Sequence, residues 1–239
     1  MTRITEVWVY LARTPLLWLT LTVVVYVGAD LLHRRLRRHA AANPVLLSVL
    51  ALLAVLHLSG TEYATYFEGA QFVHFLLGPA TVALAVPLHR ELHRGRPRAV
   101  PLTTALLAGS LTAVTTAIGT AGLLGASPGT LLSLAPKSAT TPVAMGIAEQ
   151  IGGLPSLTAA LVILTGITGA VIGTGVLRLL RVKNPVAAGL ALGTASHGIG
   201  TARAFQLDER AGAYSGLAMG LNALVTALIV PLIVRVLIR

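Results

Sequence analysis

The chain of 239 residues contains no cysteine and has few charged and few aromatic residues. The absence of cysteine excludes a disulfide scaffold, a thiolate metal site and a thiol nucleophile. Charged residues make up 11% of the chain, against about 25% in an average soluble domain. With 55% apolar residues, a soluble fold would not cover its surface with polar groups, and a disordered chain is excluded as well. The composition therefore predicts an integral membrane protein.

Acidic residues are also scarce, because the chain has 8 Asp and Glu against 18 Lys and Arg. In a soluble protein this balance would indicate nucleic-acid binding. Here 13 of the 18 basic residues lie in four clusters outside the apolar runs, at 33–39, 89–98, 178–183 and 235–239. This distribution is typical of membrane orientation, and only 5% of the residues are aromatic. We therefore expect a lipid bilayer as partner, and no nucleic acid.

Seven apolar segments predict membrane-spanning helices, each requiring about 20 residues. The charge-free run 99–136 is too long for one helix, and we end that helix near Gly125, where turn residues begin. The start of the chain, with acidic Glu6 and no cleavage site, does not resemble a signal peptide. The predicted spans are 14–29, 39–61, 69–89, 99–125, 150–177, 184–202 and 211–234.

The basic clusters predict the orientation of these spans in the cell inner (plasma) membrane. Placing the clusters in the cytoplasm puts the N-terminus outside and the C-terminus in the cytoplasm. Residues 126–150 then leave from and return to the outer side, which predicts a re-entrant hairpin. Its proline, serine and threonine residues suit broken backbone that lines a cavity at membrane depth.

Two similar motifs predict an internal repeat. Residues 77–81 read LGPAT and residues 192–196 read LGTAS, an offset of 115. The same offset maps the second, third and fourth spans onto the fifth, sixth and seventh, with opposite predicted directions. We therefore predict an all-α polytopic membrane protein of about seven helices and one re-entrant hairpin, with an inverted 3+3 repeat as in many secondary transporters. The chain is one membrane domain, divided into an N-terminal helix and basic linker (1–42), repeat 1 (43–125), the hairpin (126–150) and repeat 2 (151–239).

Both motifs interrupt a helix. Gly78-Pro79 removes a backbone donor, and the glycine-rich segment 193–201 disfavours continuous helix. The N-termini of broken helices carry partial positive charge and suit a carboxylate ligand. The alternative is that small residues merely allow close helix packing.

Four ionisable residues near these breaks are candidates for binding or coupling. His197 would bind substrate or carry a proton, or it would be a neutral structural imidazole. Arg203 would clamp a carboxylate or extend to the outer interface. Lys137 would reach the broken helices if the hairpin re-enters and be solvated if it does not. Glu149 would carry a proton or lie at the interface, and Asn222 would bridge helices or coordinate a cation.

These observations give the predicted site. No catalytic triad, metal-binding motif or phosphate loop occurs at useful spacing, so we expect no enzyme, no metal and no cofactor. The proton-coupling candidates are His197 and Glu149. The predicted substrate-binding residues are Gly78, Pro79, Ala80, Thr81, Lys137, Ser138, Thr140, Thr141, Gly193, Thr194, Ser196, His197, Thr201 and Arg203.

Several segments resemble the LrgB/CidB family. They are PKSATTPVAM at 136–145, IGGLPSLTA at 151–159, ALGTASHGIGTAR at 191–203, and the segments 75–88 and 216–221. The resemblance extends over residues 43–235, and its second half is the more specific. Members of this family are described as antiholin-like proteins linked to murein hydrolase export and autolysis. A plant relative is a plastidal glycolate/glycerate translocator, and some bacterial pairs are tied to pyruvate uptake.

The resemblance implies two functions from different classes. The first is secondary transport of small monocarboxylates such as glycolate, lactate or pyruvate by alternating access, with possible coupling to protons. The second is an antiholin-like regulator of a holin-type partner that affects murein hydrolase export and autolysis. The resemblance also implies a separate LrgA/CidA-type holin-like protein as partner, and we expect a homodimer.

Overall fold

The computed structural model describes residues 14–39, 42–94 and 99–237, and these residues form helices and short turns without a strand. Arg96, Arg98 and Arg239 of the predicted basic clusters lie outside the described residues. The chain forms two compact units, divided between Ala83 and Leu84. This division falls inside the segment predicted as repeat 1.

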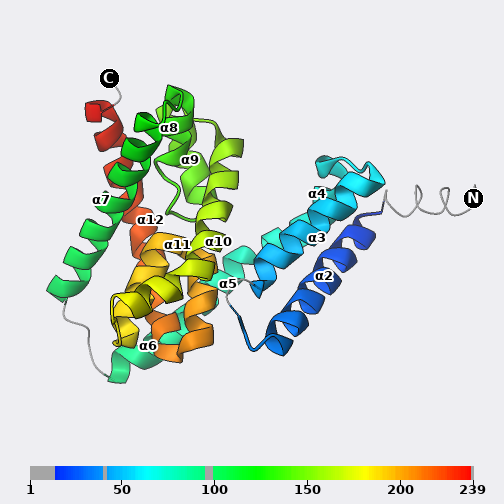
Figure 1. Cartoon of the computed structure of the whole chain (residues 1–239), viewed down its shortest axis with the longest axis horizontal. Coiled ribbons are helices and arrows are strands. Elements are labelled where there is room, and N and C mark those ends of the chain that lie inside the picture. The colour runs from blue at the N-terminus through cyan, green and yellow to red at the C-terminus, as the bar shows by residue number, and fades with distance from the viewer. Residues whose placement is uncertain (1–13, 40–41, 95–98, 238–239) are drawn as a thin grey trace, which may run out of the picture. The chain divides into compact units, whose positions relative to one another are not determined.

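The first unit consists of α2 (Pro15–Arg35), α3 (Pro44–Ser59), α4 (Tyr63–Phe75) and α5 (Leu77–Ala83) (Figure 1). α2 packs against both α3 and α4. Trp18 on α2 is fully buried and meets Tyr66 on α4 edge-to-face, with 5.8 Å between the ring centroids. As Asn43-Pro44 predicts, the Asn43 side chain caps α3, accepting from the first-turn amides of Val45 and Leu46.

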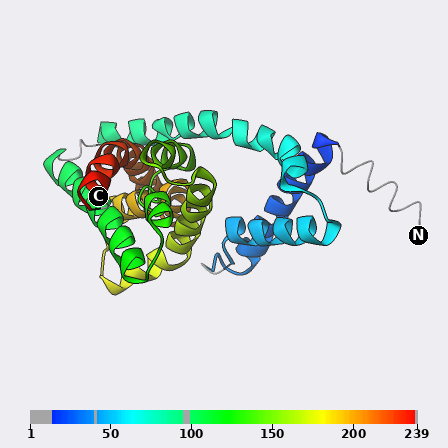
Figure 2. The same cartoon turned by 90° about the horizontal axis from the view of Figure 1, so that it is seen from above.

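The second unit contains seven helices among the residues described. Figure 2, the view from above, shows them gathered into one bundle. Two of its short helices, α8 of 7 residues and α9 of 11 residues, are joined by a six-residue turn and form a helical hairpin, called here the α8–α9 hairpin. The helices are α6 (Ala85–Arg94), α7 (Ala99–Leu123), α8 (Pro128–Leu134), α9 (Thr141–Ile151), α10 (Pro155–Leu179), α11 (Pro185–Leu207) and α12 (Glu209–Leu237).

Five described helical segments are long and apolar enough to cross a membrane, which agrees with a multi-pass membrane protein. They are Pro15–Arg35, Tyr63–Pro87, Ala99–Leu123, Pro155–Leu179 and Glu209–Val236. The predicted second span corresponds to the shorter α3, of 16 residues. α7 ends where the turn residues predict, and Gly125 just beyond it has a φ of +79°.

The prediction that residues 184–202 form a single span is wrong, because α11 folds back on itself. Ser196 and His197 have non-helical dihedral angles. A Cβ atom on Gly200 would lie 2.5 Å from the carbonyl oxygen of Leu192, whereas residues eight apart in a straight helix are separated by about 12 Å. Leu192 and Ala204 also share one apolar cluster. The two halves, 185–195 and 198–207, therefore form a second helical hairpin, called here the α11 hairpin.

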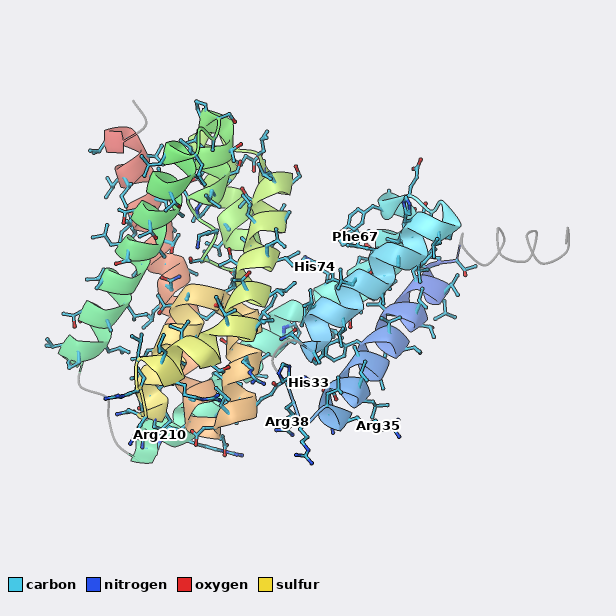
Figure 3. The ribbon with its side chains drawn as sticks, viewed as in Figure 1. His33, Arg35, Arg38, Phe67, His74 and Arg210 are labelled. Atoms are coloured by element: carbon cyan, nitrogen blue, oxygen red, sulfur yellow. The ribbon has the colours of Figure 1, made fainter. Side chains whose placement is uncertain are left out.

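The direction of α12 also differs from the prediction. The Ser110 and Thr226 hydroxyls are 3.4 Å apart, and Val114 and Val230 lie in one apolar cluster, so α7 and α12 run parallel. Arg210, near the start of α12, lies at the lower end of the unit in Figure 3, and α12 runs upward from it. The fourth and seventh spans thus do not run in opposite directions, as the 115-residue repeat requires.

The two hairpins occupy equivalent places in the chain, each between two long helices. The α8–α9 hairpin joins the end of α7 to the start of α10, and the α11 hairpin joins the end of α10 to the start of α12. Their open ends therefore lie at opposite ends of the unit, and their tips point toward each other. This arrangement decides where the candidate site lies.

Candidate functional site

The turn of the α8–α9 hairpin is buried in the second unit. Ala135, Ser138 and Ala139 are at most 4% exposed. The base of this hairpin is fixed to α10, because Ser133 Oγ accepts from the Leu154 amide at 2.8 Å and its carbonyl accepts from the Thr158 hydroxyl at 3.0 Å. Loops usually lie on the surface, where water satisfies their backbone groups. A buried turn therefore needs polar partners within the protein.

The tip of the α11 hairpin is held by the His197 ring. Nε2 lies 2.8 Å from the carbonyl oxygen of Val162 on α10. Because a carbonyl only accepts, Nε2 carries the proton in this contact. The backbone of His197 has a φ of +40°, a conformation that costs non-glycine residues about 1–3 kcal/mol. The tip is thus a strained turn that its contacts with α10 maintain.

Glycines on α10 leave the space that the tip of the α11 hairpin occupies. A Cβ atom on Gly166 would lie 2.6 Å from the His197 ring, and one on Gly169 would collide with the Ser196 side chain. On the other side, Cβ atoms on Gly189 and Gly193 would collide with the carbonyl oxygens of Ala211 and Ser215 on α12. Such close packing of helices through small residues is common in membranes.

Gly169→Ala should destabilise the protein by about 1–3 kcal/mol, because the added methyl group displaces Ser196. Gly175→Ala on the same helix is the matched control, since nothing lies within 4 Å of a Cβ atom there. Thermal unfolding of both variants in detergent measures the difference. Equal unfolding temperatures would contradict the proposed packing of α10 on the hairpin tip.

Asn222, the fourteenth residue of α12, joins the two hairpins. Its Nδ2 donates to the carbonyl oxygen of Ser138 at 3.1 Å and to that of Thr194 at 3.2 Å. The first carbonyl belongs to the turn of the α8–α9 hairpin and the second to the α11 hairpin. One side chain therefore binds both tips.

A second polar contact links the α11 hairpin to α12. Thr201 Oγ1 donates to the carbonyl oxygen of His197 at 2.9 Å, so the Ser215 hydroxyl at 3.0 Å donates to Thr201. All three residues are buried. Together with Thr194, Ser196, Ser138 and Asn222 they form a continuous buried polar group, called here the tip cluster.

Two buried side-chain atoms in the tip cluster, Ser138 Oγ and Asn222 Oδ1, have no hydrogen-bond partner among the residues that the structure describes. The helix that follows the turn is also uncapped, because the Thr140 side chain makes no capping hydrogen bond to the first turn of α9. Buried polar atoms are normally paired, so an unpaired set points to a missing ligand or water. Amide donors at a helix start and a serine hydroxyl suit an anion.

The positive charge at this place comes from Lys137, which precedes Ser138 in the turn. Lys137 is half-buried, and its charge acts on the His197 ring. Among the described residues it forms no ion pair with a carboxylate. Nor do these residues include a group of three or more His, Cys, Asp or Glu that could hold a metal ion. The tip cluster thus contains no acidic residue, and a lysine directly precedes one of its members in the sequence.

The other predicted residues of the second unit have different surroundings. Glu149 is exposed on α9, eight residues or about 12 Å beyond its first residue. Arg203 is buried in α11 and donates to Gln206 on its own helix at 2.9 Å. Glu149 thus lies away from the turn, and Arg203 has a hydrogen-bond partner on its own helix. Thr141 is half-buried in the first turn of α9.

The predicted residues of the third span belong to the first unit. Gly78, Pro79 and Ala80 are exposed on α5, and the side chain of Thr81 lies outside the described residues. The interruption predicted at Gly78-Pro79 occurs at Leu76, between α4 and α5, and again at Leu84.

The sequence makes no prediction for Ser215, and it leaves two roles open for Asn222, bridging helices or coordinating a cation. Asn222 does bridge helices, as one of its two alternatives states. The available signal was an amide within an otherwise apolar span, which is costly unless it is hydrogen-bonded. Ser215 gives no comparable signal, because small hydroxyl residues are common in membrane helices.

Comparison with known proteins gives consistent matches over most of the chain. The model of the LrgB-like family matches residues 22–236. The protein YwbG of Bacillus subtilis, described as uncharacterized, is 38% identical over 213 residues, which cover 89% of this chain and 94% of YwbG. YxaC of the same organism, also uncharacterized, is 35% identical and covers 90% and 93% of the two chains.

A named relative is the holin-like protein CidB of Staphylococcus aureus strain N315. It is 30% identical over 219 residues, covering 92% of this chain and 95% of CidB. No solved structure matches this chain.

Proposed function

This chain belongs to the LrgB-like family, and from its tip cluster we propose that it is a secondary transporter of small monocarboxylates. The observation that carries the proposal is the buried, unpartnered hydroxyl of Ser138 at the uncapped start of α9, beside Lys137. A carboxylate placed there accepts from Ser138 Oγ and the first amides of α9, and it pairs with the Lys137 ammonium. Glycolate, lactate and pyruvate are the class we expect.

The two hairpins give a physical route for transport. Neither α8 nor α9 is long enough to cross a hydrocarbon core of about 30 Å, so we propose that both hairpins re-enter the membrane from opposite sides. Asn222 lies about 20 Å along α12, which supports a position of the tips within the membrane. Movement of either hairpin tip away from Asn222 opens the site to one side, as alternating access requires.

We keep the first three basic clusters in the cytoplasm and correct the predicted side of the C-terminus, which carries the fourth cluster at 235–239. The N-terminus is outside, and the cluster at 178–183 is cytoplasmic in this proposal. Because α12 begins at the end of the unit where α10 ends, it runs from the cytoplasm outward. The C-terminus is then outside rather than in the cytoplasm.

The partners belong to the same proposal. We propose a plasma-membrane location, a homodimer and a separate LrgA/CidA-type holin-like protein as partner. His197 is the proton-coupling candidate that lies in the tip cluster, since its neutral ring carries the proton on Nε2 and leaves Nδ1 to take another. The exposed position of Glu149 gives no support to a coupling role.

The second candidate function is regulation of a holin-type partner that affects murein hydrolase export and autolysis. The name of the relative CidB, holin-like protein, favours it. A regulator that acts through its surface does not need unpaired polar atoms in its interior, where they are costly. The tip cluster therefore supports transport more directly.

Uptake of labelled glycolate, lactate and pyruvate into proteoliposomes that hold only this protein tests the proposal. We expect saturable uptake above that of protein-free liposomes, increased by an inward proton gradient if His197 couples protons. If uptake is absent, both alone and with a co-reconstituted LrgA/CidA-type protein, transport is the wrong function and the regulatory candidate stands.

A further inference from the structure

The amide of Asn222 has only one orientation that its surroundings allow. Its Nδ2 donates to two carbonyl oxygens, those of Ser138 and Thr194. Carbonyl oxygens accept hydrogen bonds and never donate them. Rotating the amide by 180° would bring Oδ1 against two other acceptors. The hydrogen-bond pattern therefore fixes Nδ2 toward the hairpin tips and Oδ1 away from these two carbonyls.

Asn222 Oδ1 is consequently a buried acceptor with no donor. Asn222 has no exposed surface, and Oδ1 has no hydrogen-bond partner among the residues described. Leaving such an atom unpaired costs about 1–3 kcal/mol. Ser138 Oγ, on a residue that Asn222 contacts directly, is unpartnered as well and can donate. The tip cluster thus presents one vacant acceptor and one vacant donor on two residues in contact.

A metal cation is a poor occupant for this acceptor. The tip cluster contains no carboxylate, and the half-buried Lys137, which directly precedes Ser138 in the turn, adds a positive charge that disfavours a second one. Hard cations in proteins are bound mainly by carboxylate and carbonyl oxygens in larger sets. A neutral O–H donor, by contrast, pairs with Oδ1 without adding charge.

We propose that Asn222 Oδ1 accepts a hydrogen bond from the 2-hydroxyl group of the substrate and so determines specificity at the second carbon. This inference rests on the transport function proposed above. The carboxylate lies at Ser138, Lys137 and the start of α9, and the hydroxyl on the adjacent carbon donates to Oδ1. A 2-keto acid places a carbonyl oxygen opposite Oδ1, so two acceptors face each other and neither is satisfied. Asn222 therefore selects 2-hydroxy over 2-keto carboxylates.

Three acids of the same carbon skeleton test the inference. L-lactate, propionate and pyruvate carry a hydroxyl, two hydrogens and a keto oxygen at the second carbon. We expect the unaltered protein to bind them in that order, with at least about a tenfold preference for lactate over pyruvate, as one lost buried hydrogen bond implies. Competition against labelled lactate uptake and thermal stabilisation in detergent provide two independent readouts.

The variant Ser138→Ala distinguishes recognition of the carboxylate from recognition of the second carbon. Because Ser138 contacts the common carboxylate, its loss should weaken all three acids by about the same factor and preserve their order. A changed order in Ser138→Ala would assign recognition of the second carbon to Ser138 and overturn the role of Asn222.

Three other results would each overturn the inference. Pyruvate binding as tightly as lactate overturns the inference while leaving transport of monocarboxylates intact. Propionate binding as tightly as lactate shows that Oδ1 is satisfied by water or an ion and likewise overturns it. If none of the three acids binds or is taken up, the proposed function falls together with the inference.

Discussion

Replacing Lys137 by methionine should reduce carboxylate uptake at least about 100-fold while leaving the protein folded. The Lys137 ammonium is half-buried and has no ion pair with an acidic residue among those described. In the proposed site a substrate carboxylate is its partner, and removing one member of a desolvated charge pair costs about 2–5 kcal/mol. Methionine retains the length and apolar surface of the lysine stem. Initial uptake rates in proteoliposomes over a range of substrate concentrations measure the effect.

Lys183 provides the matched control, because it is the only other lysine of this sequence. It is exposed between α10 and α11, within a basic cluster. Lys183→Met should retain nearly all uptake. If Lys137→Met transports as well as Lys183→Met, the carboxylate does not bind at the turn of the α8–α9 hairpin.

Replacing Asn222 by leucine should abolish uptake and also lower stability. The change removes both donors that join the hairpins and leaves the carbonyl oxygens of Ser138 and Thr194 without that partner. Hydrogen bonds between membrane helices average about 0.6 kcal/mol and reach about 1.7, so we expect a loss of about 1–3 kcal/mol. Thermal unfolding in detergent and uptake in proteoliposomes measure the two effects separately.

Asn184→Ala is the control for Asn222→Leu, because it removes an asparagine that caps a helix but does not join the two hairpins. Asn184 caps the first helix of the α11 hairpin by accepting from the Val186 amide at 2.8 Å, and it is exposed. Its removal should cost about 1 kcal/mol and leave uptake unchanged. An Asn222→Leu variant with normal unfolding temperature and normal uptake would show that the tips need no bridge.

The regular helices and their ends were predictable because their causes are local. Asn43-Pro44 and Asn184-Pro185 both start helices, since the asparagine side-chain oxygen caps amides two or three residues further along the chain. Gly125 ends α7 because it adopts a positive φ. The α8–α9 hairpin was also predictable, since residues 126–150 are broken by proline and too short to cross twice.

The fold of α11 was not predictable in the same way. Residues 184–202 are charge-free and long enough for a span, and the glycine-rich segment 193–201 predicts a break in that helix. The break is confirmed at Ser196 and His197, but the sequence did not predict that the chain reverses there. The reversal at Ser196 and His197 depends on partners far along the chain. Val162 accepts from the His197 ring, and Gly166 and Gly169 provide the space. Once α11 reverses, α12 runs parallel to α7, and the 115-residue repeat loses its basis.

The sequence by itself determined the class of protein, the family, and most residues of the site. Apolar runs and scarce charge require a membrane, and polar residues within them are costly enough to indicate function. Only the tertiary structure decided which of these residues lie together. It placed Ser138, Thr194, Ser196, His197 and Thr201 with Asn222 and Ser215, and left Glu149 outside. The physical reason is that a hairpin tip is positioned by hydrogen bonds and close packing with distant helices, which no local pattern encodes.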